Sequence, residues 1–272
     1  MSKLRRLASL LPSLAREWRA CARLCADPSS AMRLGLDFAL ARFLAASPEE
    51  DQARAVRTVR TVHLKGGVRL SYRLNKGDLH GIREVWLDEC YRLPFENSSG
   101  ALLDLGANIG LTSVWLARKY GFAPVIAVEP DPRNAALARR NLEQNAINGE
   151  VIEAAIGPRE GAAHFEASGI SNLGKVSTTG SPVRMTTVAA ILEKSGCARF
   201  ALVKMDIEGG EQELLAGPTD WLDRVDAIIA EFHPDRIDYP GAIRSIAARG
   251  LKYIPASSVF PHNMDSFVSR RP

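Results

Sequence analysis

Apolar and polar positions alternate regularly from residue 100 onwards. Short apolar runs, typical of buried strands, are separated by segments with the three- and four-residue spacing of amphipathic helices. The pattern predicts strands over 101–105, 124–129, 150–155, 200–206 and 227–231, and helices over 110–119, 132–144, 208–216 and 239–249. Apolar pieces around Tyr253 and Phe267 follow. Such alternation predicts an α/β fold, a mostly parallel, doubly wound sheet with helices on both faces.

The pattern lapses between Gly157 and Ser181, where Gly, Ser, Thr and Asn dominate. A polar stretch of this length is typical of a lid over a site or of a long surface connection. Both interpretations stay open.

The first hundred residues follow other patterns. Apolar residues recur at helical spacing from Leu4 to Cys21, with Lys and Arg between them, and further helices are expected over 31–45 and from 47–50. Two β-rich segments, 58–64 and 68–74, flank a glycine turn and predict a hairpin, and 78–91 is expected to be mostly helical. We therefore expect an N-terminal helical extension over 1–56, a hairpin and helical lead-in over 57–99, and a core domain over 100–272.

The basic amphipathic segment at the N-terminus has three interpretations. Its basic face is typical of helices that lie on an anionic membrane surface. Helices with this pattern also dock on their own domain or on a second subunit, which would make a homodimer. Peripheral membrane contact and dimer formation both stay open as expectations.

Composition narrows the class of protein. The chain has 272 residues, 46% of them hydrophobic, which is enough for one full α/β core. The net charge is +4, but Lys and Arg are interleaved with acids along the chain, so a nucleic-acid partner is not expected. No apolar run reaches the roughly 18 to 20 residues that span a bilayer. Four cysteines without metal-finger spacing favour packing roles and a cytoplasmic location.

Polar residues gather where the predicted parallel strands end. In an open parallel sheet, ligands bind beyond the carboxyl ends of the strands, beside the point where the strand order reverses. The residues at or just after such ends are Asp104, Gly106, Asn108, Gly110, Glu129, Asp206, Glu208, Glu231 and His233. Their convergence predicts a nucleoside-cofactor site.

The turn after the first core strand distinguishes two cofactors. A dinucleotide cradle uses Gly-x-Gly-x-x-Gly around a pyrophosphate, but here Asn108 stands at the middle glycine and Asp104 would repel a phosphate. A cationic amino-acid portion suits that acid, which favours S-adenosylmethionine over NAD. Glu129 is placed to accept hydrogen bonds from ribose hydroxyls in either cofactor.

Four strings carry a resemblance to a known family. They are Asp104-Leu-Gly-Ala-Asn-Ile-Gly110, Val128-Glu-Pro-Asp-Pro132, Ala154-Ala-Ile-Gly157 and Val203-Lys-Met-Asp-Ile-Glu-Gly-Gly-Glu211. The chain resembles the FkbM-type S-adenosylmethionine-dependent methyltransferases from about Leu79 to the C-terminus. The segment from Gly81 to Tyr91 is similar to that family's lead-in.

The resemblance implies a Rossmann-like class I methyltransferase domain that methylates a hydroxyl of a sugar, glycoconjugate or polyketide-type acceptor, often in secondary metabolism. It further implies a cofactor site in which the segment from Asp104 to Gly110 holds the methionine end and Asp206 lies near the transferring methyl group. The cofactor-binding residues expected on this basis are Asp104, Gly106, Ala107, Asn108, Gly110, Glu129, Pro130, Ala154, Ala155 and Asp206.

A hydroxyl acceptor needs a base or a metal to manage its proton. His233 is the first candidate base because it follows the strand that ends at Glu231. Asp206 and Glu208 are alternatives as base or acceptor-orienting groups, whereas Glu211 is expected to stabilise a helix N-terminus. Asp206, Glu208 and Glu231 could also hold Mg²⁺, although the spacing does not demand a metal.

Two other functions remain open on the sequence alone. One is an NAD-type oxidoreductase on the same topology, and the other is a non-catalytic scaffold that retains the fold.

Overall fold

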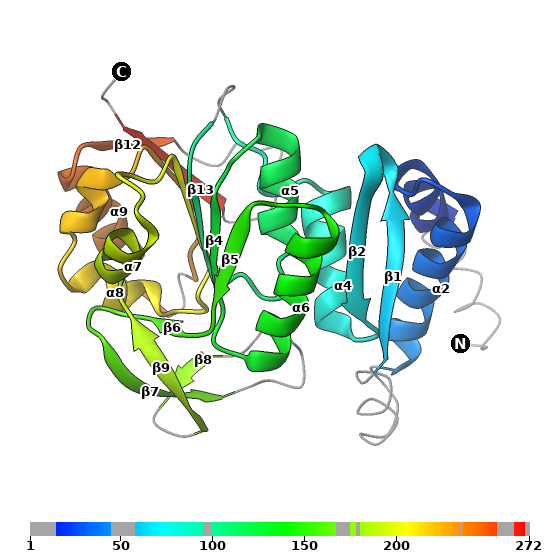
Figure 1. Ribbon diagram of the computed structural model, residues 1–272, viewed down its shortest axis with the longest axis horizontal. Coiled ribbons are helices and arrows are strands. Elements are labelled where there is room, and N and C mark those ends of the chain that lie inside the picture. The colour runs from blue at the N-terminus through cyan, green and yellow to red at the C-terminus, as the bar shows by residue number, and fades with distance from the viewer. Residues whose placement is uncertain are drawn as a thin grey trace, which may run out of the picture. The chain divides into compact units, whose positions relative to one another are not determined.

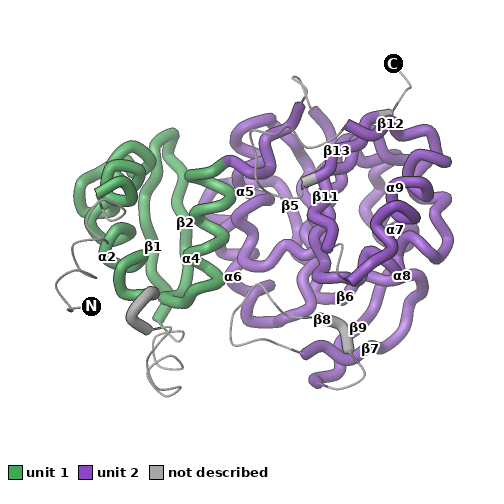
Figure 2. Tube along the Cα trace, turned by 180° about the vertical axis from the view of Figure 1, so that it is seen from behind, with its two compact units in different colours: residues 1–88 green, residues 89–272 purple. Residues whose placement is uncertain are grey.

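The computed structural model describes residues 15–44, 58–94, 99–166, 175–177, 180–233, 236–254 and 264–269. The chain forms two compact units, residues 1–88 and residues 89–272, which Figure 2 colours separately. The sequence instead suggests boundaries after residues 56 and 99, and that three-part division stays a prediction.

The first unit combines helices with a hairpin. Residues 15–24 are helical, and α2 (Pro28–Leu44) and the hairpin of β1 (Val59–Leu64) and β2 (Val68–Arg73) follow. Then α4 (Lys76–Ile82) continues as a π-helical turn over Arg83–Leu87. The helix over 31–45 and the hairpin are confirmed, while the helix predicted over 78–91 begins earlier and ends at Leu87. The expected helical start at 47–50, and residues 4–14 of the basic segment, lie outside the described residues.

The second unit is built on a seven-stranded sheet. Its strand order is β12 (Leu251–Ile254), β13 (Met264–Ser269), β11 (Ala227–Glu231), β10 (Leu202–Met205), β3 (Leu102–Leu105), β4 (Val125–Val128) and β5 (Gly149–Ile152). The five strands from β11 to β5 run parallel, and β13 pairs antiparallel with both β11 and β12. The predicted doubly wound α/β class is confirmed.

Helices cover both faces of this sheet (Figure 1). On one face lie α5 (Leu111–Tyr120) and α6 (Pro132–Gln144), and on the other lie α7 (Val188–Ser195), α8 (Glu211–Ala216) and α9 (Tyr239–Ala248). Because the chain leaves β3 toward one face and β10 toward the other, the strand order reverses between these two neighbours. This switch point is where a ligand site is expected.

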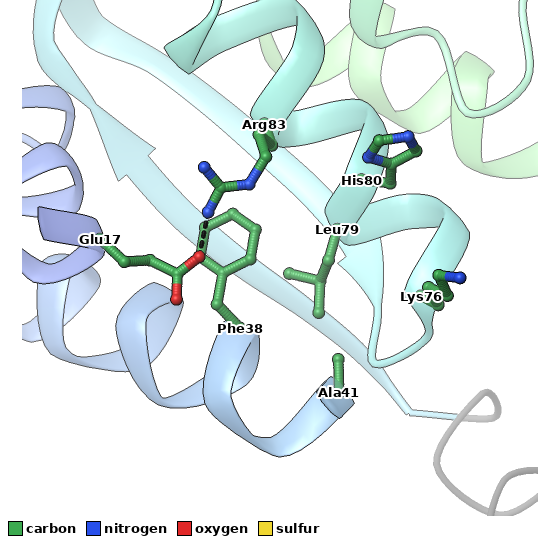
Figure 3. A pocket seen from close by; sticks show the side chains of 7 residues that line it. All are labelled: Glu17, Phe38, Ala41, Lys76, Leu79, His80 and Arg83. Atoms are coloured by element: carbon green, nitrogen blue, oxygen red, sulfur yellow. Dashed lines mark hydrogen bonds and ion pairs between the residues drawn. The ribbon is translucent and has the colours of Figure 1, made fainter. Parts of the chain in front are cut away.

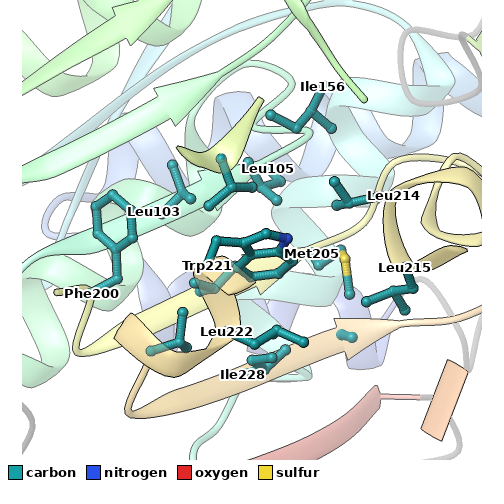
Figure 4. Packing of buried hydrophobic residues seen from close by; sticks show 14 of the residues in the cluster. Leu103, Leu105, Ile156, Phe200, Met205, Leu214, Leu215, Trp221, Leu222 and Ile228 are labelled. Atoms are coloured by element: carbon teal, nitrogen blue, oxygen red, sulfur yellow. The ribbon is translucent and has the colours of Figure 1, made fainter. Parts of the chain in front are cut away.

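The apolar core lies under the second group of helices (Figure 4). Leu103 and Met205, both fully buried on adjacent strands, belong to one cluster with Trp221 from the short 3₁₀ helix Asp220–Arg224. Leu214 of α8 and Ile246 of α9 complete the layer. The cluster anchors the two strands whose ends carry the acidic residues of the candidate site.

A second, smaller sheet occupies the region predicted to be a polar loop. It has the order β6 (Ala155–Ile156), β9 (Ser181–Thr186), β7 (Gly161–Glu166) and β8 (Lys175–Ser177). The prediction missed these strands because β7 buries Phe165 alone, so its sequence shows little apolar alternation. The strand expected over 150–155 is likewise interrupted after Ile152. Whether the region acts as a lid stays a prediction.

The four cysteines are free thiols, and Cys21 and Cys25 are buried, as expected for packing residues. None of the described helices combines the length and apolar character needed to cross a bilayer.

Candidate functional site

Lys204 lies at the centre of the polar cluster at the switch point. It is 2% exposed and faces Asp104 across the β3–β10 pair. Its Nζ lies 3.2 Å from Asp104 Oδ1, donates to the carbonyl oxygen of Gly106 at 2.8 Å and lies 3.9 Å from Asp206 Oδ2. Burial lowers the pKa of Lys204, but the carboxylates of Asp104 and Asp206 outweigh that effect and raise it overall. Lys204 is therefore a buried cation that links both strand ends.

Asp104 is completely buried and already paired. Its Oδ2 accepts a hydrogen bond from Ser113 Oγ at 2.6 Å, while Oδ1 faces Lys204. From the sequence, the Asp104 carboxylate is expected to meet the cationic amino-acid portion of a cofactor. Because Lys204 balances the charge of Asp104 inside the protein, we infer that Asp104 holds the end of β3 in place. Direct contact between Asp104 and a cofactor stays a prediction.

The glycines of the turn allow close backbone packing. Gly106 has φ +75°, and a Cβ there would lie 1.8 Å from the carbonyl oxygen of Asp206. Gly110, with φ +77°, precedes α5, and its Cβ would lie 3.1 Å from Ala138 Cα of α6. The neighbouring Ala107 is buried. These glycines therefore let neighbouring strands and helices pack closely. From the sequence they were expected to let the backbone approach a ligand instead.

Glu129 follows β4 and is 5% exposed. Its two oxygens accept the backbone N–H groups of Asn108 at 2.8 Å and Asp131 at 2.9 Å. Burial raises the pKa of Glu129 to about 7, although these hydrogen bonds oppose the shift. The buried Oδ1 of Asn108 has no hydrogen-bond partner among the described residues. The Glu129 carboxylate, which Pro130 follows in the chain, is thus tied by a hydrogen bond to the turn that also carries the buried acceptor oxygen of Asn108.

Tyr91 completes the environment of Asp206. Its hydroxyl donates to Asp206 Oδ2 at 3.2 Å, and its ring lies under Lys204 Nζ, 5.6 Å from the ring centre. Burial and the charge of Asp206 raise the pKa of Tyr91 well above its usual value, so the phenol stays neutral. The sequence analysis missed this residue because it lies 115 positions before its partner.

Glu208, His233 and Arg236 form a second group. Glu208 has a left-handed backbone (φ 56°), and its Oε2 pairs with Arg236 Nη1 at 2.8 Å and lies 3.6 Å from His233 Nε2. Burial and Asp206 raise the pKa of Glu208, while His233 and Arg236 act in the opposite direction. The buried Nδ1 of His233 has no hydrogen-bond partner among the described residues. Arg236 is a residue that the sequence analysis did not find.

The acids gather differently from the metal set suggested by the sequence. Asp206, Glu211 and His233 each offer a ligand atom within 4.8 Å of the others, whereas Glu208 and Glu231 do not belong to this group. Glu211 is fully buried and accepts the N–H groups of Ile207 and Gly209, each at 2.8 Å. This geometry confirms its structural role at the start of α8. Mg²⁺ binding stays a prediction.

A pocket of about 190 Å³ lies beside the Glu208–Arg236 pair. Its lining residues are Ile156, Met185, Glu208, Gly209, Gly210, Glu213 and Arg236. Ala154 and Ala155, expected to bind the cofactor, are buried, and Ala155 precedes the pocket residue Ile156 in β6. The pocket combines apolar walls with a charged pair, which suits a polar acceptor of moderate size.

Proteins of known activity are similar to this chain. It is 26% identical over 230 residues to the 31-O-demethyl-FK506 methyltransferase FkbM of Streptomyces tacrolimicus, covering 70% of this chain and 86% of that protein. It is 32% identical over 161 residues to the hexuronic acid methyltransferase AglP of Haloferax volcanii, covering 57% of this chain and 64% of that protein.

The structure and the family model agree with these similarities. A crystal structure of methyltransferase FkbM from Methylobacillus flagellatus KT matches 96% of this chain with a TM-score of 0.50 and 15% identity, so it shows the fold alone. The chain spans 60% of that solved chain. A family model described as the methyltransferase FkbM domain matches residues 104–259, which is more than half of the chain. The Rossmann-like methyltransferase fold expected from the sequence is confirmed, and the chain belongs to the FkbM methyltransferase family.

Proposed function

We propose that the protein transfers a methyl group from S-adenosylmethionine to a hydroxyl oxygen of a sugar, glycoconjugate or polyketide-type acceptor. Family membership supports methyl transfer. The names of two relatives, one acting on 31-O-demethyl-FK506 and one on a hexuronic acid, support an oxygen-rich acceptor. The observation that carries the proposal is the acid-rich switch point, where Tyr91 and Lys204 hold the carboxylate of Asp206.

The charges at the switch point fit this cofactor. Asp104 and Asp206 together carry two negative charges against the single positive charge of Lys204, so the cluster retains one negative charge. That charge attracts the ammonium and sulfonium groups of S-adenosylmethionine and repels a pyrophosphate. Because Asp104 is enclosed, Asp206 is the acid that meets the cation. The NAD-type alternative is thereby disfavoured, in agreement with the family match.

When bound, S-adenosylmethionine supplies an electrophilic methyl group on a sulfonium. Glu129 would accept hydrogen bonds from the ribose hydroxyls, and the buried Asn108 Oδ1, which has no partner among the described residues, would gain a donor. Tyr91 and Lys204 hold the Asp206 carboxylate from two sides. This fixed arrangement positions the methyl group, and positioning is a large part of catalysis in a direct displacement.

His233 receives the proton of the acceptor hydroxyl. Glu208 lies near its Nε2 and favours the tautomer that carries hydrogen there. Nδ1 then keeps its lone pair; it is buried without a hydrogen-bond partner among the described residues, so the acceptor hydroxyl would have to reach it as it binds. Arg236 forms an ion pair with Glu208. We infer that Arg236 positions Glu208 and that Glu208 in turn positions the His233 ring.

Measurements of cofactor binding and of methyl-transfer rate distinguish the two proposed roles, cofactor binding by Asp206 and proton acceptance by His233. S-adenosylhomocysteine should bind with micromolar affinity in calorimetry, and NAD should not bind. Asp206→Asn should weaken that binding at least about tenfold, since it removes a charge-assisted contact. His233→Gln should leave binding unchanged and lower methyl transfer by about 10² to 10⁴-fold, the usual contribution of a general base.

Other outcomes would contradict the proposal. Equal loss of binding in both variants would remove the division of roles. Intact binding without methyl transfer to any sugar or polyketide hydroxyl tested would favour the non-catalytic scaffold. Turnover that disappears with EDTA and returns with Mg²⁺ would favour the metal alternative over His233 as the base.

A further inference from the structure

Helix α2 exposes three large apolar side chains along one side. Met32, Leu36 and Leu40 are 55%, 48% and 44% exposed. They are four residues apart, which places them in one row on the helix surface. The same helix buries Leu34 and Phe38 on its other side. Scattered exposed apolar residues are ordinary, but a continuous row on a helix that already has a buried face needs a partner.

Trp18 belongs to the same surface. It comes from the helix over 15–24, is 38% exposed, and its ring lies over Gly35, where a Cβ would meet it at 3.1 Å. Gly35 immediately precedes Leu36 in α2. We call the surface formed by Trp18, Met32, Leu36 and Leu40 the α2 patch.

The exposed charges around the α2 patch are mainly basic. Arg16, Arg19 and Arg23 are exposed on the helix over 15–24, and Arg33 is exposed on α2. Arg33 lies three residues before Leu36 and seven before Leu40, so it borders the row. Arg33 thus borders the patch directly, and three more exposed guanidinium groups lie on the helix that carries Trp18.

The acids of these two helices point inward or are half-buried. Glu17 is 5% exposed and pairs with Arg83 beside Phe38, in the wall of a separate pocket of about 320 Å³ (Figure 3). Asp37 is 1% exposed and accepts from Tyr72 and Arg60. Asp27 is half-buried and caps α2 through Ser30. The fold therefore withdraws two of these three acids, Glu17 and Asp37, from the surface that carries the arginines.

We propose that the α2 patch binds the surface of an anionic lipid bilayer. Apolar side chains with a tryptophan enter the boundary between headgroups and acyl chains, while the arginines contact anionic headgroups. The charge of the patch selects this partner, because the guanidinium groups complement phosphate headgroups. The inference is independent of the proposed function. Binding to the bilayer would bring the protein close to any lipid-linked or membrane-embedded acceptor.

Vesicle flotation with the full chain tests the proposal. The protein should float with vesicles of phosphatidylglycerol and phosphatidylcholine and not with phosphatidylcholine alone, and salt should weaken the binding. Replacing Arg16, Arg19 and Arg23 by Gln should lower partitioning on the order of 100-fold, since each basic residue contributes about fivefold near an anionic surface. Leu36→Glu with Leu40→Glu should lower it by at least about as much.

Two control variants match the double Glu and the triple Gln variants of the patch. They make the same changes in charge at exposed positions of the second unit. They are Ala136→Glu with Ala189→Glu, and Arg140→Gln with Arg159→Gln and Arg184→Gln. Equal losses in patch and control variants would overturn the proposal, as would flotation with neutral vesicles alone. A lipid-free dimer in sedimentation that Leu36→Glu with Leu40→Glu dissociates would also overturn it, because the patch would then be a protein interface. Binding of S-adenosylhomocysteine should be unchanged in every variant, which separates this result from the proposed function.

Discussion

Buried carboxylates are stabilised differently in two regions of the site. One region is the turn after β4, and the other is the pair of strand ends at β3 and β10. After β4, Glu129 is surrounded by backbone N–H dipoles, and its pKa rises to about 7. At the ends of β3 and β10, Lys204 pairs directly with Asp104 and Asp206, and the three groups keep one net negative charge. At Glu129 the cost of burial outweighs the backbone hydrogen bonds, whereas at Lys204 the neighbouring carboxylates outweigh the cost of burial. The first region can change its protonation near neutral pH, and the second is an ionic scaffold.

Gly106→Ala should have the largest effect, because the Gly106 turn joins the two regions. The added Cβ would collide with the carbonyl oxygen of Asp206, and the residue has φ +75°. We expect a loss of more than about 5 kcal/mol of unfolding free energy, measured by urea denaturation, or failure to fold. Gly121→Ala is the control: its φ is +81° with nothing within 4 Å, so about 1–2 kcal/mol of strain is expected. Equal effects would mean that backbone contact at Gly106 is unimportant.

Lys204→Met should be the next largest change, because it leaves Asp104 buried without its counter-charge. Removing one member of a buried ion pair costs about 3–5 kcal/mol. Adding Asp104→Asn to Lys204→Met should recover much of that loss, which a double-mutant cycle in urea would measure. Strict additivity of the two substitutions would contradict the pairing.

Glu129→Gln should change the pH dependence of stability. The folded-state pKa of about 7 exceeds the ordinary 4.5, so the folded protein holds this proton more tightly than the unfolded chain does. The resulting stabilisation is complete below pH 4.5 and is lost as pH rises to 7, by up to roughly 1.4 kcal/mol per pH unit. The variant should lose that slope, at the cost of one of the two backbone hydrogen bonds, because its amide offers a single acceptor oxygen. Parallel stability curves for the two proteins would show that Glu129 does not titrate in this range.

Tyr91→Phe should have the smallest effect. It removes the hydrogen bond to Asp206, whose carboxylate keeps Lys204 as a neighbour. A loss of about 1 kcal/mol in thermal or urea unfolding is expected. A loss as large as that of Lys204→Met would show that the phenol, rather than the ammonium, supports this strand end.

The sequence predicts the strands and helices of the second unit well because their apolar periodicity is strong. It also places the acids at one edge of the sheet, since the carboxyl ends of parallel strands must meet there. It does not reveal which acid is enclosed: Asp104 and Asp206 look equivalent until Ser113 and Lys204 are seen to surround the first. Tyr91 and Arg236 carry no local signal, because their roles depend on partners distant in the sequence.

Other differences have simple physical causes. Strand β7 was missed because one buried side chain cannot produce a visible alternation. Helix α7 did have a detectable signal, in Thr187 as a capping residue and in Val188, Ile191 and Leu192 at helical spacing. Among the described residues, the ligand atoms that lie within 4.8 Å of one another belong to Asp206, Glu211 and His233, because α8 begins at Glu211 beside the end of β10, and Mg²⁺ binding stays a prediction.

The small sheet has a consequence for how such enzymes diversify. Strands β7, β8 and β9 pair with one another and with β6, and among the described strands they share no ladder with the seven-stranded sheet. Its hairpins can therefore lengthen, shorten or be exchanged between homologues without breaking the main sheet. Met185, in β9, lines the pocket next to Glu208, so a change in this module would reshape one wall of that pocket while the seven-stranded sheet stays intact.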